Sequence, residues 1–530
     1  MKQPTKLLCI AFVLCLALSP VGGCAQESPI CISAGVPEPL TSELNSDTDW
    51  YLLMLKNRYN ITFDFYNSYN DFDSITDLWI QSQDMPDVIC GSIEINKYME
   101  FAQQGLLGSF PEGWETAYPH LYQEYQAAQM QHLCELNGKT YVYPRIIIAT
   151  EMGLPFNAIS LPWHDSLFVR SDWIKEMTGD LLLTDQWSFD QLFNYLSAAI
   201  ARNPDQADEV SGLAGTAFFL TRQFLCAYNP YYDYCYKVDG KYVLGAAQEG
   251  TIDGIRQMKR FYDAGLFVPG FQFNTLEEAI NLFSVGGAAA VASEGHATGT
   301  ADLLQALYQN NDHVTDYYTI KPVFMVDDQG VFRYPYSYPF WRTILISPYL
   351  KDDPQKEAAV FSLLEHFATL EGTIEPYDGI RGITWDFDDK GKPYALSLPT
   401  VVRNMRSVGC KLLYHICPSS QDAYELISPM QTDLTKAAGA LTISIYNHKL
   451  QYMDPSVPTF VEMSDFFFAT SVNRTLYNQI DWQAEILRIV MADEDIDIAA
   501  AWNAVIQRTQ PLWQPLLDEL NHSGSDSSAQ

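Results

Sequence analysis

The sequence is poor in basic residues and holds only one long apolar run. Of its 530 residues, 32 are Lys or Arg and 65 are Asp or Glu, which gives a net charge of −33. Such an acidic excess repels polyanions, so we expect no nucleic acid among the partners. Outside the N-terminal run, no stretch approaches the roughly eighteen apolar residues of a transmembrane helix, so no further segment is expected to cross a membrane.

Signatures of catalysis and of metal binding are also missing. The sequence contains no HExxH pair, no GxSxG elbow and neither GxGxxG nor the GxxxxGK[ST] phosphate loop. Nothing marks two carboxylates as the acid and base of a glycosidase. We therefore expect no enzymatic activity, no cofactor and no metal ion. A secreted glycoside hydrolase is the enzymatic alternative.

Cysteine is scarce in the body of the chain. Ten cysteines are present, and those beyond residue 24 are odd in number and form no CxxC pair. Most of them are expected to be buried free thiols. Disulfides between Cys226 and Cys235 or between Cys410 and Cys417 are the alternatives.

The one long apolar run has the form of a signal peptide. Lys2 and Lys6 precede twelve apolar residues at positions 7–18. As a helix these would span about 18 Å, which is too short for a hydrocarbon core of roughly 30 Å. The following VGGC resembles the bacterial lipobox, in which the cysteine becomes the lipidated first residue. We predict a lipoprotein signal peptide over residues 1–23, a lipid anchor on Cys24 and a tether over 24–30, with a conventional secretory signal as the alternative.

Strand and helix patterns alternate through almost all of the remaining chain. CISAGV, ITFDFY and DVICG read as strands, and the segments between them carry apolar residues at helical spacing. This alternation indicates α/β architecture with parallel sheets covered by helices. About 500 residues are too many for one core, so two lobes are expected.

Seven short segments resemble those of one family. They are DMPDVI, YMEFAQQGLLGSF, NGKTYVYPR, LFVRSDWIKEMTGDLLLTDQWSFDQL, AGLFVPGF, FSVGGAAAVASEG and PYDGIRGITWDFDDKGKPY. In this order, behind a lipobox, they resemble the extracellular carbohydrate-type (family 1) solute-binding lipoproteins of bacterial ABC importers. The resemblance spans residues 31–520. It implies a periplasmic-binding-protein-like fold of type II, with a ligand cleft between two lobes and three hinge crossings.

The resemblance also implies the positions of the crossings, near residues 169–172, 341–344 and 395–400. Lobe 1 would then comprise residues 31–168 and 343–395, and lobe 2 residues 171–341 and 396–520. Residues 521–530 are expected to form a disordered tail. The implied molecule is a monomer that closes on its ligand and is then presented to ABC permease subunits.

One segment departs from the family pattern. Members often carry a calcium loop of the form DPDGNGKxDTYG where this chain reads NPDQADEVSGLAG, at residues 203–215. The central glycine, which allows such a loop to turn sharply, is missing. We expect no calcium here, although Asp205, Asp208 and Glu209 supply carboxylates.

Candidate ligand contacts are aromatic, charged and polar side chains, because sugars offer hydroxyls and apolar ring faces. Ligands of open α/β sheets bind beyond the carboxyl ends of the strands, which selects Glu38, Ser92, Glu294 and His296. Trp341 and the adjacent Arg342 lie at the expected second crossing, and Trp163 and Tyr231 are further aromatic candidates. The resemblance implies contacts in SDFFFA, which adds Asp465 and Phe466. Structural alternatives remain: Trp341 as core, Arg342 as an ion-pair partner, His296 as a loop hydrogen-bonding residue, and the tyrosine-rich segment around Tyr231 as a packed loop.

The function implied by the resemblance is ligand capture at the outer face of the cell membrane. A carbohydrate is the first expectation for the solute, and a peptide, a polyamine or another small solute is the alternative. A surface adhesin or structural lipoprotein would be a third class, because it would need no ligand site between lobes.

Overall fold

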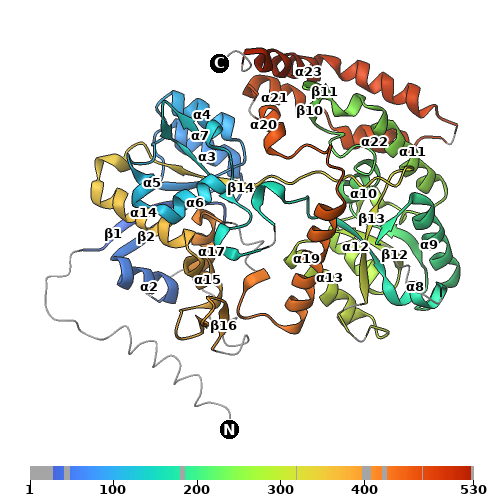
Figure 1. The fold of residues 1–530 in the computed structure, drawn as a ribbon, viewed down its shortest axis with the longest axis horizontal. Coiled ribbons are helices and arrows are strands. Elements are labelled where there is room, and N and C mark those ends of the chain that lie inside the picture. The colour runs from blue at the N-terminus through green and yellow to red at the C-terminus, as the bar shows by residue number, and fades with distance from the viewer. Residues whose placement is uncertain are drawn as a thin grey trace, which may run out of the picture.

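Two α/β lobes, each built around a five-stranded sheet, lie side by side and are joined by crossing segments (Figure 1). The computed structural model describes residues 28–40, 48–154, 156–178, 185–314, 316–317, 319–396, 408–419, 426–467, 469–493 and 495–526. The predicted signal peptide and Cys24 lie outside these residues. Within them, no helix combines the length and the apolar character needed to cross a lipid bilayer.

The sheet of lobe 1 has the strand order β2-β1-β3-β14-β6. Its strands are β1 (Ile30–Val36), β2 (Ile61–Asn67), β3 (Val88–Gly91), β6 (Val142–Ile146) and β14 (Phe340–Ile346). β1 runs parallel to β2 and β3, as the alternating pattern predicted. The expectation of an all-parallel sheet is wrong for β14, which is antiparallel to β3 and β6 because it returns from the other lobe.

The helices of lobe 1 cover both faces of this sheet (Figure 1). They are α2 (Trp50–Tyr59), α3 (Phe72–Gln81), α4 (Ile95–Gln103), α5 (Trp114–Ala117), α6 (Pro119–Ala127), α7 (Gln131–Cys134), α14 (Pro354–Ala368), α15 (Leu370–Asp378) and α17 (Val408–Leu413). Two short hairpins belong to the same lobe, β4 (Glu135–Leu136) with β5 (Lys139–Thr140) and β15 (Trp385–Phe387) with β16 (Pro393–Ala395). An Asn-Gly turn joins β4 to β5, with positive φ at Asn137 and Gly138.

The sheet of lobe 2 has the order β8-β13-β7-β12-β9 and mixes the two directions. Its strands are β7 (Ser166–Arg170), β8 (Gln186–Trp187), β9 (Ser211–Ala214), β12 (Ala288–Ser293) and β13 (Ile320–Met325). β7 is antiparallel to both neighbours, whereas β12 is parallel to β9 and β13 to β8. The chain enters this lobe through β7. The start of β7 lies beside the end of β12, so the two strands run in opposite directions.

Helices surround this second sheet and extend beyond it towards the C-terminus. They are α8 (Ser171–Thr178), α9 (Phe189–Arg202), α10 (Ala217–Leu225), α11 (Glu249–Asp263), α12 (Leu276–Ser284), α13 (Ala297–Asn310), α19 (Asp433–Tyr452), α20 (Ser464–Phe467), α21 (Ser471–Tyr477), α22 (Trp482–Val490) and α23 (Ile498–Asp526). The hairpin of β10 (Cys235–Val238) and β11 (Lys241–Leu244) also lies here. α9 begins with a capping box formed by Ser188 and Gln191. α23 continues to Asp526, past the start of the predicted disordered tail at residue 521.

The first two crossings lie earlier in the sequence than the resemblance implied. β7 already pairs within the sheet of lobe 2, so residues 166–168 belong to lobe 2 and the first crossing runs over residues 147–165. β14 already pairs within lobe 1, so Trp341 and Arg342 belong to lobe 1 and the second crossing runs over residues 326–339. The predicted positions are wrong because each crossing leads directly into a strand. The apolar pattern of a sequence predicts the strand but does not indicate which of the two sheets the strand joins.

The third crossing lies later than residues 395–400, of which 397–400 fall outside the described residues. Residues 408–419, predicted for lobe 2, pack on lobe 1. Gly409 N donates to Asp49 Oδ2 at the start of α2 (3.0 Å), and Arg145 Nε on β6 donates to Cys417 O (2.6 Å). The chain is in lobe 2 again at α19, where Thr442 Oγ1 donates to Gly295 O (2.9 Å). The crossing therefore falls between residues 419 and 433.

A second, smaller core packs the first crossing against both lobes. Ile148, Phe156 and Leu161 of the crossing are buried together with Trp385 of lobe 1 and Tyr446 of α19. The rings of Phe156 and Tyr446 meet edge to face, with centroids 5.0 Å apart. The crossing is thus a packed element and not a free linker.

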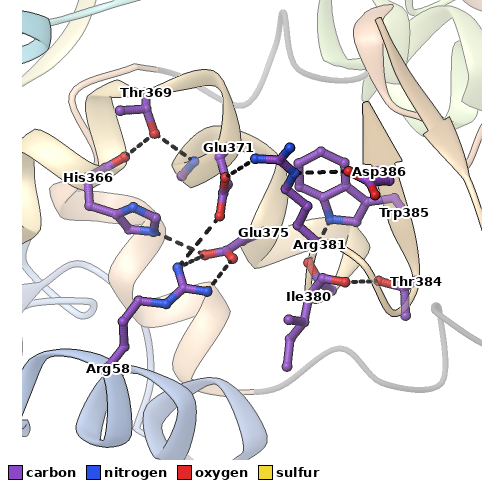
Figure 2. Close-up of polar contacts among 12 residues, drawn as sticks. Arg58, His366, Thr369, Glu371, Glu375, Ile380, Arg381, Thr384, Trp385 and Asp386 are labelled. Carbon is purple, nitrogen blue, oxygen red and sulfur yellow. Dashed lines mark hydrogen bonds and ion pairs between the residues drawn. The ribbon is translucent and has the colours of Figure 1, made fainter. Parts of the chain in front are cut away.

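A network of ion pairs holds α15 against α2 in lobe 1 (Figure 2). Glu375 is fully buried, and its two carboxylate oxygens accept from the guanidinium of Arg58 at 3.0 and 3.1 Å. His366 Nε2 lies 3.0 Å from the same carboxylate. At the rim, Arg381 pairs with Glu371 and with Asp386 of β15, both at 3.0 Å. The last family-like segment of the sequence is thereby fixed to the N-terminal half of the lobe.

The cysteines of the described chain are free thiols. Cys31 is exposed and the others are buried, so the expectation of buried thiols is confirmed for all but Cys31. Neither of the alternative disulfides is formed.

Candidate functional site

The ends of strands from both sheets are directed towards the crossings, and most of the predicted ligand contacts lie there. In lobe 1 the carboxyl ends of β1 and β3 lie at the same edge as the start of the antiparallel strand β14. In lobe 2 the end of β12 lies beside the start of β7. The chain crosses between lobes at these edges, because β6 ends next to the start of β14 and leads to β7. We call the two groups of residues the lobe-1 and lobe-2 half-sites.

The lobe-1 half-site contains Glu38, Ser92, Trp341 and Arg342. Ser92 follows β3, and its carbonyl accepts from Thr343 Oγ1 at 2.9 Å. Glu38 follows β1, and its Oε1 lies 3.2 Å from His415 Nε2. Burial, together with the nearby cations of Arg145 and Arg342, lowers the pKa of His415 to about 2, so this imidazole is neutral at pH 7.

A β-bulge at the start of β14 turns Trp341 and Arg342 out of the regular strand. Phe340 pairs with Ile146 and Thr343 with Pro144, which leaves one extra residue on β14. Arg342 has φ of 69°, a left-handed conformation that is unfavourable for a residue other than glycine. The side chain of Trp341 is 46 % exposed, so its alternative role as core is wrong. The Arg342 guanidinium lies over the ring of Phe72, 4.7 Å from its centroid, and no carboxylate partner is recorded for it among the described residues.

The lobe-2 half-site contains Trp163, Glu294 and His296, together with His164. The rings of Trp163 and His164 are stacked, with centroids 5.4 Å apart. His164 meets His296 edge to face at 4.9 Å, and His296 Nε2 lies 2.9 Å from Glu294 Oε2. His296 also caps α13, since its Nδ1 accepts from Gly299 N at 3.3 Å. These predicted residues, separated by 130 positions in the sequence, therefore form one cluster.

Two buried basic side chains, Arg222 and Lys449, contact Trp163 of this cluster and Asp165. Arg222 of α10 lies over the ring of Trp163, 4.7 Å from its centroid, and its Nε is 3.4 Å from Asp165 Oδ2. Lys449 of α19 donates to the carbonyls of Trp163 and Asp165 at 2.7 and 2.6 Å. Burial lowers the pKa of Lys449 to about 7. A small cavity of about 10 Å³ adjoins Asp165, Ser166 and Lys449 and has room for one water molecule.

Several polar atoms of this half-site are buried without a hydrogen-bond partner among the described residues. They include Trp163 Nε1, Arg222 Nη2 and Ser293 Oγ. None of these three residues lines the small cavity. Buried donors without partners are rare in native proteins, because each lost hydrogen bond costs about 1–3 kcal/mol. A bound molecule with several hydroxyl groups would provide the missing partners.

The remaining candidates lie away from these two half-sites. The ring of Tyr231 is buried, its hydroxyl donates to Pro458 O (2.6 Å), and it lines a separate pocket with Tyr228 and Tyr236. Asp465 pairs on the surface with Lys237 at 3.0 Å. Phe466 is buried against Tyr234 and Tyr477. These contacts assign packing and ion-pair roles to the three residues.

Sequence reasoning missed His164, Asp165, Arg222 and Lys449. The available signal was a charged or titratable residue within an apolar segment, as for Arg222 in AFFLTRQFL and for His164 and Asp165 just before SLFVR. Residues of this kind are almost never buried unless they are paired. The sequence could mark them as unusual but could not show which residue pairs with which.

The segment that replaces the family's calcium loop uses its first carboxylate for another purpose. Asp205 Oδ2 accepts from Arg170 Nη1 (2.9 Å) and from Asn311 Nδ2 (2.6 Å), and Oδ1 accepts from Trp173 Nε1 (2.8 Å). Burial opposes ionisation, but these donors outweigh it and hold the pKa of Asp205 below its usual value. Asp205 thus anchors α8 and α13 to the sheet.

Comparisons with known proteins find similarity in structure but not in sequence. No family model and no curated protein matches the sequence. The S. pneumoniae ABC-transporter substrate-binding protein FusA, in complex with kestose, superposes with a TM-score of 0.65 at 16 % identity, covering 94 % of this chain and 99 % of FusA. An extracellular solute-binding protein from Bifidobacterium longum subsp. infantis gives 0.64 at 12 % identity, covering 94 % and 100 %. The S. pneumoniae N-glycan transport solute-binding protein NgtS gives 0.56 at 14 %, covering 94 % and 99 %. This chain has the two-lobed α/β fold of the substrate-binding proteins of ABC transporters.

Proposed function

We propose that this protein captures an oligosaccharide between its lobes and delivers it to the permease of an ABC importer. The observation that carries the proposal is the lobe-2 half-site. There the indole of Trp163 adjoins buried polar atoms that have no partner within the described part of the chain. A sugar supplies both an apolar ring face and hydroxyl groups, so it matches both features at once.

The lobe-1 half-site offers a second set of contacts at the opposing edge. Trp341 is exposed beside Arg342, and the left-handed backbone at Arg342 marks a strained position of the kind that clusters at ligand sites. A ligand that touches both half-sites binds the closed form more tightly than the open form. That difference in affinity drives closure.

The structural neighbours support a carbohydrate in particular. The FusA structure is a complex with kestose, and NgtS is an N-glycan transport solute-binding protein. These neighbours are binding proteins and not enzymes, which agrees with the absence of catalytic signatures in the sequence. The proposed partners are a sugar and the permease subunits, and the proposed working form is a monomer.

The proposal includes a lipid anchor on Cys24 that holds the protein at the outer face of the cell membrane. It rests on the apolar run at residues 7–18 and on the lipobox-like VGGC. A few residues of tether would then separate the anchor from β1.

A thermal-shift panel tests the choice of ligand class. Neutral oligosaccharides, sugar acids, peptides and polyamines are added to purified protein. A specific ligand at 100 times its Kd adds about 2.7 kcal/mol to the free energy of unfolding. We expect an oligosaccharide to raise the melting temperature. If only a peptide or a polyamine does so, the proposed carbohydrate function is wrong, and hydrolysis of nitrophenyl glycosides above background would contradict a pure binding role.

A further inference from the structure

Three metal-ligating side chains converge in the lobe-2 half-site. His164 lies just before β7, Glu294 just after β12, and His296 at the start of α13. One nitrogen or oxygen atom of each lies within 4.8 Å of the corresponding atoms of the other two. Two imidazoles and one carboxylate are a common donor set for Zn²⁺ and related divalent ions. The sequence did not reveal this group, because 130 residues separate His164 from Glu294.

The backbone places these residues together without help from a ligand. Ser166 of β7 and Ser293 of β12 are direct partners in the sheet, so the residues just outside this pair are neighbours. Gly295 N donates to His164 O at 3.0 Å, and a Cβ atom at position 295 would lie only 2.3 Å from that oxygen. Thr442 Oγ1 of α19 fixes the Gly295 carbonyl from the other side. A site held by strand pairing is preorganised for its ligand.

Side chains of both kinds of charge lie next to His164. Arg222 lies over the ring of Trp163 and is 3.4 Å from Asp165 Oδ2, and Lys449 Nζ donates to the carbonyls of Trp163 and Asp165. Glu294 itself provides the negative charge in direct contact with a bound ion.

We propose that His164, Glu294 and His296 bind one divalent transition-metal ion, with Zn²⁺ as the first candidate. Three protein ligands leave at least one coordination position for water or for an oxygen of the solute. The ion would also join the first crossing, which carries His164, to the end of β12. This inference does not depend on the proposed sugar-binding function, although the two sites share Glu294 and His296 of the lobe-2 half-site.

Titration of the full-length mature protein with Co²⁺, without any sugar, tests the site. We expect saturation at one equivalent, with visible absorption bands of a four- or five-coordinate ion that disappear when Zn²⁺ is added. Calorimetry with Zn²⁺ alone should give the same stoichiometry. The absence of saturable one-to-one binding of either ion would overturn the proposal.

Three variants locate the ion while preserving the fold. H164F keeps a ring against Trp163, E294Q is isosteric, and H296N keeps an N-cap for α13. Each should weaken Zn²⁺ binding at least about tenfold, with the melting temperature of the metal-free protein as the check on folding. H132Q alters an exposed histidine outside the group and should bind as the native protein does. Unchanged affinity in all three variants would place the ion elsewhere and refute the assignment.

The two proposals fail separately. If Zn²⁺ binds at one equivalent but no sugar raises the melting temperature, the metal site stands and the carbohydrate function does not. If a sugar binds EDTA-treated native protein as well as untreated protein, and Co²⁺ gives no saturable signal, the carbohydrate function stands and the metal site does not.

Discussion

Pro162 of the first crossing pairs in antiparallel register with Tyr336 of the second. Two backbone hydrogen bonds flank the pair, from Trp163 N to Pro335 O and from Ser337 N to Leu161 O, both at 2.9 Å. We therefore expect the two crossings to move as a unit when the lobes close. We expect the amide protons of Trp163 and Ser337 to exchange slowly with solvent both with and without ligand, since exchange requires this pairing to open. Hydrogen exchange at the rate of an exposed loop would show that the crossings move independently.

Trp341 should carry a large part of the ligand affinity. Replacing it with alanine removes an exposed aromatic ring from the lobe-1 half-site and should weaken binding of the oligosaccharide found by the panel at least tenfold, or about 1.4 kcal/mol. Because the side chain is 46 % exposed, the melting temperature of the free protein should hardly change. Y349A is the matched control, since Tyr349 is 50 % exposed just beyond the opposite end of β14. Calorimetry that finds equal affinity in W341A and the native protein would remove Trp341 from the site.

The buried carboxylate of Glu375 makes the stability of lobe 1 depend on Arg58. R58M removes the partner of a fully buried charge, and we expect a loss of about 3 kcal/mol in the free energy of unfolding. R381M breaks two exposed pairs of the same network (Figure 2) and should cost less than about 1 kcal/mol. Urea unfolding compares the two variants, and equal losses would mean that burial of Glu375 does not set the cost.

The free energy of unfolding should fall as the pH is lowered below about 6.5, the pKa of histidine in an unfolded chain. Burial lowers the pKa of His448, which is stacked on Phe324, to about 4, and that of His415 to about 2. The unfolded chain has histidine pKa values of about 6.5, so it binds more protons than the folded chain below that pH. The contribution is fully present above about pH 6.5 and is lost progressively towards pH 4. H448Q should flatten the pH dependence in this window by up to about 1.4 kcal/mol per pH unit, whereas H132Q should not. Parallel curves for H448Q and the native protein would contradict the shifted pKa.

The lipid anchor is tested by the substitution C24A. Without the cysteine no lipid can be attached, so the protein should be recovered from the medium and should bind its ligand as before. Fractionation of cells that express the native and variant chains provides the measurement. Retention of processed C24A protein in the membrane fraction would disprove anchoring through Cys24.

Much of the fold was predictable because strands and helices carry local patterns. The strands at CISAGV, ITFDFY and DVICG were recognised, since each depends on a pattern of neighbouring residues. The positions of the crossings were not. FWRTILI has the same apolar character whichever sheet it enters, and only its pairing with β3 and β6 assigns it to lobe 1.

The sequence predicted that the candidate site lies at the ends of strands, but it did not predict correctly which side chains line it. The rule that ligands bind beyond strand ends selected Glu38, Ser92, Glu294 and His296, and all four lie at the two half-sites. Phe466 was selected by the family resemblance, but it is buried in an aromatic cluster, and burial depends on contacts with residues distant in the sequence. The bulge that exposes Trp341 arises from the mismatch between β14 and β6 and has no local sequence signal.

The sequence by itself determined the chemical character of this protein. Its acidic composition, its alternating elements, its family-like segments and its cysteine behind a short apolar run are properties of residues and their neighbours along the chain. The tertiary structure alone decided which side chains meet. His164 contacts His296, and Arg58 reaches Glu375, only because strands and helices from distant parts of the chain pair and pack. Such contacts depend on the register of sheets, and a linear pattern of residues does not specify that register.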